Sequence, residues 1–308
     1  MPIICCTATA TRKVRDDIVS TLGLNPDKLK VFTMTTSRPN LHYEVRFKAD
    51  DCDHYDNFVT WLKATHERRM QNAERASELA ARKERATNVS GIIYTLFRKD
   101  CEILASRLCE DGIGAKPFHA GLSPEQKDDH LSGWIANKEG YDVIVATTAF
   151  GMGIDKENVR FVVHWQIPKS FEGFYQEAGR AGRDGKASLC ILYYSREDRD
   201  RASSRMAQEQ SKKQNARGNY NGEIDASWRS RGQSLKALID YCENTRACRH
   251  ALISQYFGDG ESASCDWACD WHKDPIGLVN RKDDGLANEE WCATQRQTGA
   301  YNEYDGYE

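Results

Sequence analysis

The chain has 308 residues and a formal net charge of −3, and 40% of its residues are hydrophobic and 29% are charged. This composition is typical of a globular protein with one large or two medium domains, and it excludes a protein that binds nucleic acid through an overall basic field. No stretch approaches the roughly 20 apolar residues that cross a bilayer, so no membrane partner is expected. Eleven cysteines without an N-terminal secretory signal predict a reducing compartment, where cysteines pack or bind metal.

The first segment with a distinct character is the charged insertion at residues 63–88. It is dense in Glu, Arg, Lys and Ala and contains few large apolar residues. This pattern predicts a solvated helix or connector. A phosphate-contacting role is the alternative.

From residue 91 to residue 194, short apolar runs alternate with helical patterns. This alternation is typical of βαβ units and predicts an α/β fold with a parallel sheet and flanking helices. Ser123 and Gln126 have the spacing of a capping box, which predicts a helix start, and Ser170 is expected to cap the helix that carries Gln176. The expected strands are residues 91–94, 115–118, 143–146, 159–163 and 187–194, with a helix over residues 99–110.

The segment QEAGRAGRDG at residues 176–185 is the most informative one in the chain. Gln176, Arg180 and Arg183 are spaced i, i+4 and i+7, so a helix through them would place all three side chains on one face. Guanidinium groups are always charged and carry a planar fork of donors that fits phosphate oxygens, which indicates a clamp for a nucleoside triphosphate. The alternative is a solvated basic helix end, although each glycine in it would weaken such a helix by about 1 kcal/mol.

Two later segments lack the pattern of regular structure. Residues 207–232 are polar and include Gly218, Asn219, Asn221 and Gly222, which predicts a flexible linker. Residues 276–308 show no periodicity and mix Gly, Asn, Asp and Glu, which predicts a disordered tail. Between these segments, two amphipathic helices are expected in a domain over residues 233–275.

Four candidate zinc ligands lie in that domain. Cys248 is near the start of the second amphipathic helix, and Cys265, Cys269 and His272 follow as Cys-x3-Cys-x2-His. Thiolates and an imidazole in two close groups form the donor set of a tetrahedral structural zinc site. The alternative is that Cys248 is only a buried helix residue and that the others lie in a flexible turn.

Several of these motifs together resemble the RecQ family of DNA helicases. FGMGIDK at residues 150–156 and QEAGRAGRDG at 176–185 resemble motifs V and VI, TATA at 7–10 resembles motif III, and SRPNL at 37–41 resembles the start of the second motor lobe. The resemblance implies a RecA-like C-terminal lobe over residues 37–206, after a remnant of the first lobe over residues 1–36. It extends to a zinc-binding subdomain, in which His272 stands where the family usually has cysteine. It is closest to the branch of the family that lacks a winged helix.

The resemblance also implies an activity, which is 3′-to-5′ DNA unwinding driven by ATP, in DNA repair or recombination in the nucleus. The expected partners are ATP, single-stranded DNA and duplex junctions, with recombination or repair proteins. By resemblance, Arg183 is the arginine finger, Arg180 and Gln176 support it, and Asp155 and Gly153 bind the nucleotide. The residues expected to contact DNA are Arg98, His119, Gly121, Thr147 and Thr148.

Each of these roles has a plainer alternative. Asp155 in a tight turn can bond its own backbone. His119 can be a packed histidine, and Arg98 can be an ordinary surface arginine. A threonine that ends a strand, as Thr147 does, is common without any ligand.

The sequence contains no phosphate-binding loop ending in Lys-Ser or Lys-Thr and no acidic box for magnesium. In the family both lie before motif III, so ATP with magnesium is expected to bind only together with a first motor lobe. The 308-residue polypeptide alone is therefore expected to hydrolyse no ATP at a useful rate. A truncated non-catalytic nucleic-acid-binding or interaction protein is the competing hypothesis. A separate chain that supplies the first lobe is a third.

Overall fold

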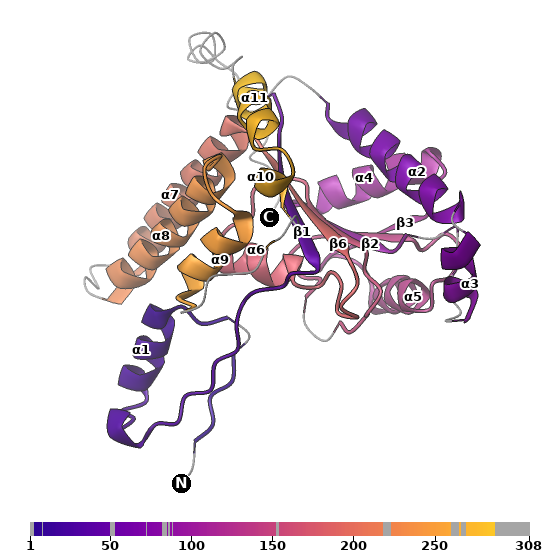
Figure 1. Ribbon diagram of the computed structural model, residues 1–308. Helices are drawn as coiled ribbons and strands as arrows, with labels where there is room; N and C mark the ends of the chain where they lie inside the picture. The colour runs from indigo at the N-terminus through magenta and orange to yellow at the C-terminus, as the bar shows by residue number, and fades with distance from the viewer. Residues whose placement is uncertain are drawn as a thin grey trace, which may run out of the picture.

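The computed structural model describes residues 3–7, 9–49, 53–71, 73–81, 85, 87, 89–151, 154–217, 223–259, 265 and 269–286. Within these residues, six strands form one sheet in the order β1-β6-β5-β2-β4-β3, and every pair is parallel. Helices cover both faces of the sheet (Figure 1), so the predicted α/β fold is confirmed. The strands are β1 (Leu41–Phe47), β2 (Gly91–Tyr94), β3 (Ala115–Phe118), β4 (Val143–Ala146), β5 (Phe161–His164) and β6 (Ser188–Tyr194).

The structure contains the helices predicted over residues 99–110, after Ser123, after Ser170 and within residues 233–275, together with further helices. The capping box of Ser123 and the cap of Ser170 are both present, so these two helix starts are confirmed. In chain order the helices are α1 (Arg12–Thr21), α2 (Tyr55–Gln71), α3 (Ala73–Ala81), α4 (Arg98–Glu110), α5 (Pro124–Ile135), α6 (Phe171–Ala178), α7 (Arg196–Arg217), α8 (Glu223–Glu243), α9 (Arg249–Phe257), α10 (Asp270–Lys273) and α11 (Pro275–Leu286), with a short 3-10 turn η1 (Pro26–Lys28).

Two hydrophobic clusters lie on opposite faces of the sheet. Successive strand residues point to opposite faces, so Ile92 belongs to one cluster and Ile93 to the other. One cluster joins the sheet to α2 and α4, and the other joins it to α5, α6, α8 and α9. The strands β2, β4 and β5 are buried on both faces and have nearly continuous apolar sequences, as parallel strands in α/β proteins do, whereas the edge strands β1 and β3 are only partly buried.

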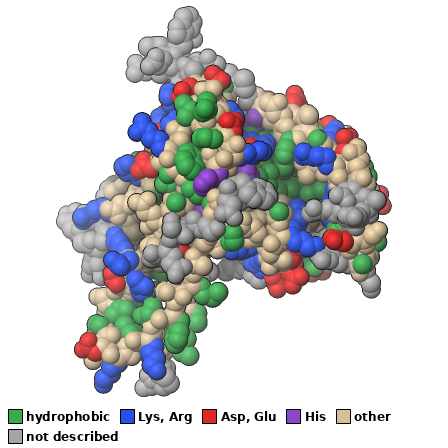
Figure 2. All heavy atoms as spheres, viewed as in Figure 1, with side chains coloured by type: hydrophobic (Ala, Val, Ile, Leu, Met, Phe, Trp, Pro, Cys, Tyr) green, Lys and Arg blue, Asp and Glu red, His purple; other side chains and the backbone are tan. Residues whose placement is uncertain are grey.

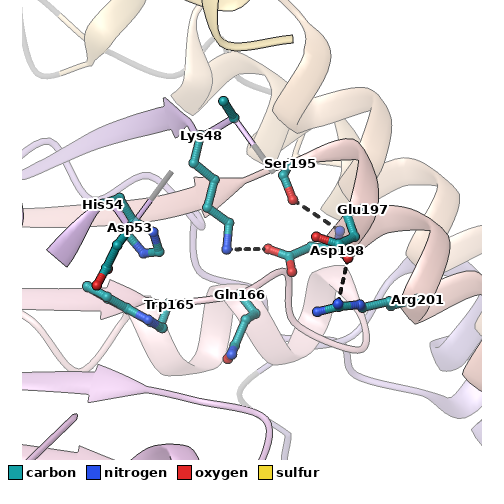
Figure 3. Close-up of a pocket in the computed structure, with 10 residues that line it drawn as sticks. Lys48, Asp53, His54, Trp165, Gln166, Ser195, Glu197, Asp198 and Arg201 are labelled. Atoms are coloured by element: carbon teal, nitrogen blue, oxygen red, sulfur yellow. Dashed lines mark hydrogen bonds and ion pairs between the residues drawn. The ribbon is translucent and has the colours of Figure 1, made fainter. Parts of the chain in front are cut away.

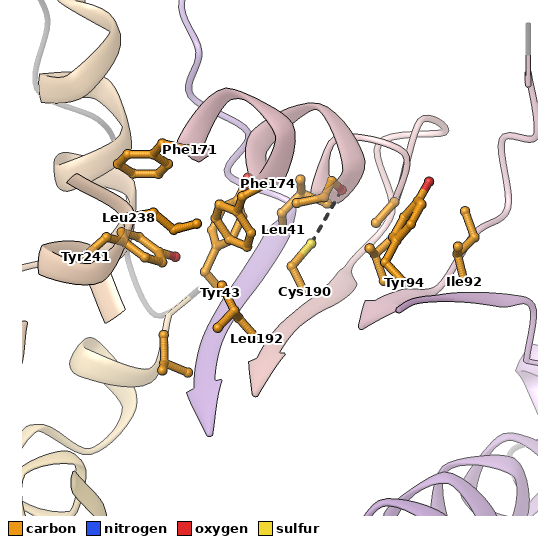
Figure 4. Close-up of a cluster of buried hydrophobic side chains, with 14 of the residues drawn as sticks. Leu41, Tyr43, Ile92, Tyr94, Phe171, Phe174, Cys190, Leu192, Leu238 and Tyr241 are labelled. Carbon is orange, nitrogen blue, oxygen red and sulfur yellow. Dashed lines mark hydrogen bonds between the residues drawn. The ribbon is translucent and has the colours of Figure 1, made fainter. Parts of the chain in front are cut away.

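The second cluster attaches the helices that follow β6 to the sheet. Figure 4 shows Phe174 of α6 between Tyr43 of β1 and Tyr241 of α8, with Phe171 beside Tyr241. The ring centroids of Phe174 and Tyr241 are 5.3 Å apart, and Tyr43, Phe171 and Phe174 are almost fully buried. The helices after β6 therefore share one hydrophobic core with the sheet.

Three structural features differ from the expectations. β1 is an additional edge strand, paired with β6, that the alternation from residue 91 does not predict. The linker prediction is wrong for residues 207–217 and 223–232, which are helical in α7 and α8, while Gly218 to Gly222 lie outside the described residues. Their helix-favouring Gln, Lys, Ala and Arg outweigh the scattered turn residues, and Met206 of α7 packs against the core.

The disorder prediction is wrong for residues 276–286, which belong to α11. Pro275 opens this helix, and the Asp274 Oδ1 accepts a hydrogen bond from the Gly277 amide at 2.9 Å. Leu278 and Leu286 are buried, and Lys282 Nζ donates to the Glu243 carbonyl at 2.6 Å, so this largely polar helix is packed against the rest of the fold. Residues 287–308 lie outside the described part of the chain.

The N-terminal segment has a different surface from the rest. No residue of α1 is buried, and Phe32 and Met34 are 90% and 92% exposed. Figure 2 shows hydrophobic side chains gathered on this segment, at the lower left. A helix with Val14 and Leu22 on its surface has apolar area that the described residues do not cover. None of the described helices combines the length and apolar character needed to cross a membrane.

Candidate nucleotide, nucleic-acid and zinc sites

The helix that carries Gln176 ends before the two arginines. α6 stops at Ala178, and Arg180 and Arg183 lie in the turns that follow, so the prediction of one helical face is wrong. Gly182 and Gly185 have φ of 55° and 72°, values in the left-handed region that a right-handed helix excludes. The glycines that seemed costly in a helix therefore build a loop instead.

Arg38 and Asn40 hold this arginine loop, residues 179–186. The Arg38 guanidinium donates to the carbonyls of residues 179, 181 and 182 at 3.4, 3.1 and 2.9 Å. The Asn40 amide donates to the carbonyls of residues 182 and 186 at 2.8 and 3.0 Å. A Cβ at residue 182 would lie 2.5 Å from Asn40 Nδ2, so glycine is required there for space as well as for φ. The sequence SRPNL marked these positions without indicating this role.

Arg183 pairs with Asp155, the other candidate nucleotide residue. Its Nη1 donates to Asp155 Oδ1 at 2.7 Å and to the Ile154 carbonyl at 2.9 Å. The side chains are 36% and 82% exposed, and an ion pair this open contributes only about 0–1 kcal/mol. Arg183 can therefore exchange this partner for a phosphate at little cost. Gly153 lies outside the described residues.

Arg180 and Gln176 approach two other motifs. Arg180 is close to Gly151 of the FGMGIDK segment, because a Cβ at residue 151 would lie 2.9 Å from Arg180 Nη2. Arg180 Nε is buried and has no hydrogen-bond partner among the described atoms, which is costly for a charged group. Gln176 Nε2 donates to Thr9 Oγ1 at 2.6 Å. The structure thus brings the three polar side chains of the segment to the motifs at residues 7–10 and 150–156.

Five further candidates gather where neighbouring strands end, and we call them the carboxyl-edge cluster (Arg98, His119, Gly121, Thr147 and Thr148). They follow β2, β3 and β4, which are adjacent and parallel, so these strand ends lie at the same edge. A Cβ at Gly121 would lie 3.3 Å from His119 Nδ1 and 3.4 Å from Arg98 Nη1. Glycine therefore leaves both nitrogens uncovered on that side.

His119 is the buried member of the cluster. Its side chain is 3% exposed, and its Nε2 lies 3.1 Å from Glu102 Oε1. Its Nδ1 has no partner among the described residues. A buried ring nitrogen without a partner is destabilising unless a ligand or water satisfies it. Arg98 and Thr148, in contrast, are exposed.

A polar cavity of about 320 Å³ lies at the same edge, beyond the ends of β1, β5 and β6 (Figure 3). Its charges compensate one another, since Lys48 pairs with Asp198 at 2.7 Å and Arg201 with Glu197 at 2.5 Å. Burial lowers the pKa of His54 to about 3, so this histidine is neutral. No sequence motif marked this cavity, and its paired charges leave no surplus for an ion.

The four candidate zinc ligands converge. One donor atom from each of Cys248, Cys265, Cys269 and His272 lies within 4.8 Å of the others. The Cys269 sulfur is 3.9 Å from the Cys248 sulfur and 3.4 Å from His272 Nδ1. Zinc–sulfur bonds of about 2.3 Å in a tetrahedron require sulfurs about 3.8 Å apart, so the residues fit the ion. The alternative of a buried helix cysteine beside an unrelated turn does not explain this convergence.

A buried ion pair attaches the cluster to the sheet. Arg249 Nε donates to Asp270 Oδ1 at 2.8 Å, and the two side chains are 0% and 2% exposed. Asp270 Oδ2 also accepts from the Val45 amide of β1 at 3.0 Å, and Tyr43 forms a β-bridge with Cys269. These non-local contacts had no counterpart among the sequence motifs.

We expect Arg249→Met to lower the free energy of unfolding by about 3–5 kcal/mol, because it leaves Asp270 charged and buried without its partner. Urea unfolding followed by circular dichroism measures this loss. The double substitution Arg249→Met with Asp270→Leu should recover part of it. Lys236→Ala, which breaks the exposed pair with Asp240, is the control and should cost about 0.3–0.5 kcal/mol. A cost for Arg249→Met as small as the control's would show that the pair is not stabilising.

The residues just before β1 are held from two sides. Asp259 Oδ2 accepts hydrogen bonds from the Thr36 amide at 2.7 Å and from its hydroxyl at 2.5 Å. The Tyr175 hydroxyl donates to the Thr36 carbonyl at 2.9 Å, and His250 Nε2 lies 3.2 Å from the Arg38 carbonyl. Residues 36–38 are thus tied both to α6 and to the end of α9.

Comparison with known proteins separates the chain into two recognised parts. Residues 71–185 match the helicase conserved C-terminal domain, and residues 196–273 match the RecQ zinc-binding family. The chain is 40% identical over 294 residues to the mouse protein named ATP-dependent DNA helicase Q5, and 38% identical over 264 residues to the Xenopus laevis protein named RecQ-like DNA helicase BLM. These alignments include 95% and 84% of this chain but only 28% and 16% of those relatives. The chain belongs to the RecQ family, of which it contains the RecA-like C-terminal helicase lobe and the zinc-binding region.

Proposed function

We propose that this chain supplies the C-terminal motor lobe of a DNA helicase that uses ATP to move 3′ to 5′ in DNA repair or recombination in the nucleus. The arginine loop carries this proposal. Arg38 and Asn40 hold its backbone by hydrogen bonds. Arg183 extends from the loop and forms an exposed ion pair with Asp155, which a phosphate can replace. A guanidinium held in this way can stabilise the charge on a phosphoryl group that another lobe presents.

The other residues divide between nucleotide and DNA. Arg180, with its buried unpaired Nε, and Gln176 support the finger, while Asp155 receives the ribose and Gly153 also binds the nucleotide. Arg98, His119, Gly121, Thr147 and Thr148 contact the DNA backbone, on single strands and at duplex junctions. Recombination or repair proteins are the proposed macromolecular partners. The relatives' names support the class of activity, since each is called a DNA helicase.

ATP with magnesium needs a first lobe in this proposal. The sequence has no phosphate-binding loop, so a lobe that carries one has to be present, on the same polypeptide or on a separate one. The apolar, exposed residues of the segment 3–34 offer a surface for that lobe. The alternative is a non-catalytic nucleic-acid-binding protein, which the carboxyl-edge cluster favours because that cluster is complete in this chain.

Zinc has a structural role in the proposal. Cys248, Cys265, Cys269 and His272 would hold it, and the ion would supply the cross-link that fixes α9 and α10 against β1. The same four ligands leave no open position for a substrate, so no catalytic step is assigned to the metal.

We expect the chain to bind single-stranded DNA at low ionic strength and Arg98→Ala to weaken that binding about tenfold, because a hydrogen bond to a charged group contributes about 1.5 kcal/mol. Fluorescence anisotropy over a range of salt concentrations measures this effect. The slope of log Kd against the logarithm of the salt concentration should fall by about 0.7 when one phosphate contact is lost. Lys236→Ala removes the same charge on α8 and is the control. Equal effects of the two substitutions, or no binding by the unaltered chain, would contradict the proposed DNA surface.

A further inference from the structure

Phe97, beside the carboxyl-edge cluster, is an unusual residue for its position. It is the N-cap of α4, where its side chain makes no capping hydrogen bond, and it is 49% exposed. A serine, threonine, asparagine or aspartate at an N-cap stabilises a helix by about 1 kcal/mol relative to a residue without a capping group. The start of the helix therefore gains no capping from the exposed ring at this position.

Hydrogen bonds on both sides hold the backbone beneath the ring. The Phe97 carbonyl accepts hydrogen bonds from Thr95 Oγ1 at 3.1 Å and from the Cys101 amide at 3.2 Å. The Leu96 amide donates to Gln166 Oε1 at 3.1 Å. An aromatic ring on a fixed backbone loses little conformational entropy when a ligand stacks on it.

Arg205 of α7 reaches the same ring. Its guanidinium carbon lies 4.6 Å from the ring centroid of Phe97, although the two residues are far apart in the sequence. This contact occupies part of the ring, while about half of the side chain stays open to solvent. The pair therefore combines an open aromatic surface with an adjacent positive charge.

We propose that Phe97, with Arg205 beside it, stacks one base of a single-stranded nucleic acid. Stacking on an aromatic ring next to cationic side chains is how proteins bind single strands without reading sequence, because every base has a π-face. Arg98 is the next residue in the chain and faces Gly121. A phosphate at Arg98 thus places a neighbouring base within reach of Phe97. This inference rests on the DNA surface of the proposed function and adds a base contact to its backbone contacts.

The test compares Phe97→Ala with the unaltered chain in binding to oligothymidylate. We expect Kd to rise roughly 5- to 150-fold, the range for loss of one base–aromatic stack. The salt dependence should stay unchanged, because no charge is removed. Phe97→Trp should retain binding. An oligonucleotide carrying 2-aminopurine should lose fluorescence on binding to the unaltered chain and keep more of it with Phe97→Ala.

Ile103→Ala is the matched control, since Ile103 lies on the same helix and is also 49% exposed. It should leave Kd unchanged, and thermal melts should show that all variants are folded. Binding by Phe97→Ala within twofold of the unaltered chain, together with weakened binding by Arg98→Ala, would overturn the stacking site and leave the proposed DNA surface intact. Failure of the unaltered chain to bind would overturn both.

Discussion

Cys265→Ser is expected to remove zinc from the protein and to unfold the region around residues 248–273. Zinc binding to sites of this type contributes about 10–16 kcal/mol of apparent free energy, more than the whole stability of most domains. The loss should therefore exceed that of any single packing change in the same core. Metal analysis of the purified protein gives the zinc content, and near-UV circular dichroism reports on the packing of the aromatic residues around Tyr241.

Two comparisons make this test specific. Cys5→Ser changes an exposed cysteine outside the cluster and should keep one zinc per chain. His272→Cys replaces the imidazole with the ligand usual in the family and should also retain the metal, whereas His272→Ala should weaken its binding. Zinc content that is unchanged in Cys265→Ser would reject the site.

Arg183→Ala is expected to lower kcat for ATP hydrolysis by about 10³–10⁵, the effect of losing an arginine finger. The measurement needs a first motor lobe, either joined to this chain or added as a separate polypeptide. Arg183→Lys should recover little activity, because an ammonium lacks the planar fork. The KM for ATP should change less than kcat, since the finger acts mainly on the transition state.

Asp155→Asn separates the finger from its present ion pair. It removes the ion pair with Arg183 but leaves the guanidinium. If Asp155 binds the ribose as proposed, the substitution should raise KM and spare most of kcat. Lys169→Ala, an exposed change outside the arginine loop, should have no effect. Equal losses of kcat in Arg183→Ala and Asp155→Asn would show that Arg183 acts only through the pair.

Local sequence patterns predicted the strands from residue 91 onward and the starts of α5 and α6. These features depend on neighbouring residues, such as Ser123 with Gln126 or the apolar run of β4, so the sequence itself contains the signal. The convergence of the four candidate zinc ligands was also predictable, because thiols and an imidazole at short spacing have few other uses. The end of α6 was not predictable in this way. Polar residues at helical spacing predict a longer helix, and nothing in that spacing indicates that Gly182 adopts a positive φ.

The residues that hold the candidate sites in place were the hardest features to predict from the sequence. Arg38 contacts carbonyls more than 140 residues later in the chain, and Arg249 pairs with Asp270 only once α9 and α10 are packed. Such contacts follow from the tertiary fold and have no periodic signature. The helix α7 and the first half of α8 were missed for a related reason. Their residues are mostly polar and include several that favour turns, so the local pattern predicts a linker, whereas the contacts that stabilise the helices come from distant parts of the chain.

The double attachment of Thr36, to Asp259 at the end of α9 and to Tyr175 of α6, has a mechanical consequence. Because these hydrogen bonds hold residues 36–38 against the folded part of the chain, any hinge between that part and the preceding segment would lie before Thr36. Unfolding of the region around the candidate zinc ligands would remove the contact of Thr36 with Asp259 and leave only its contact with Tyr175. The candidate zinc ligands would then help to set the direction in which the chain before Thr36 leaves the sheet, although they do not touch it.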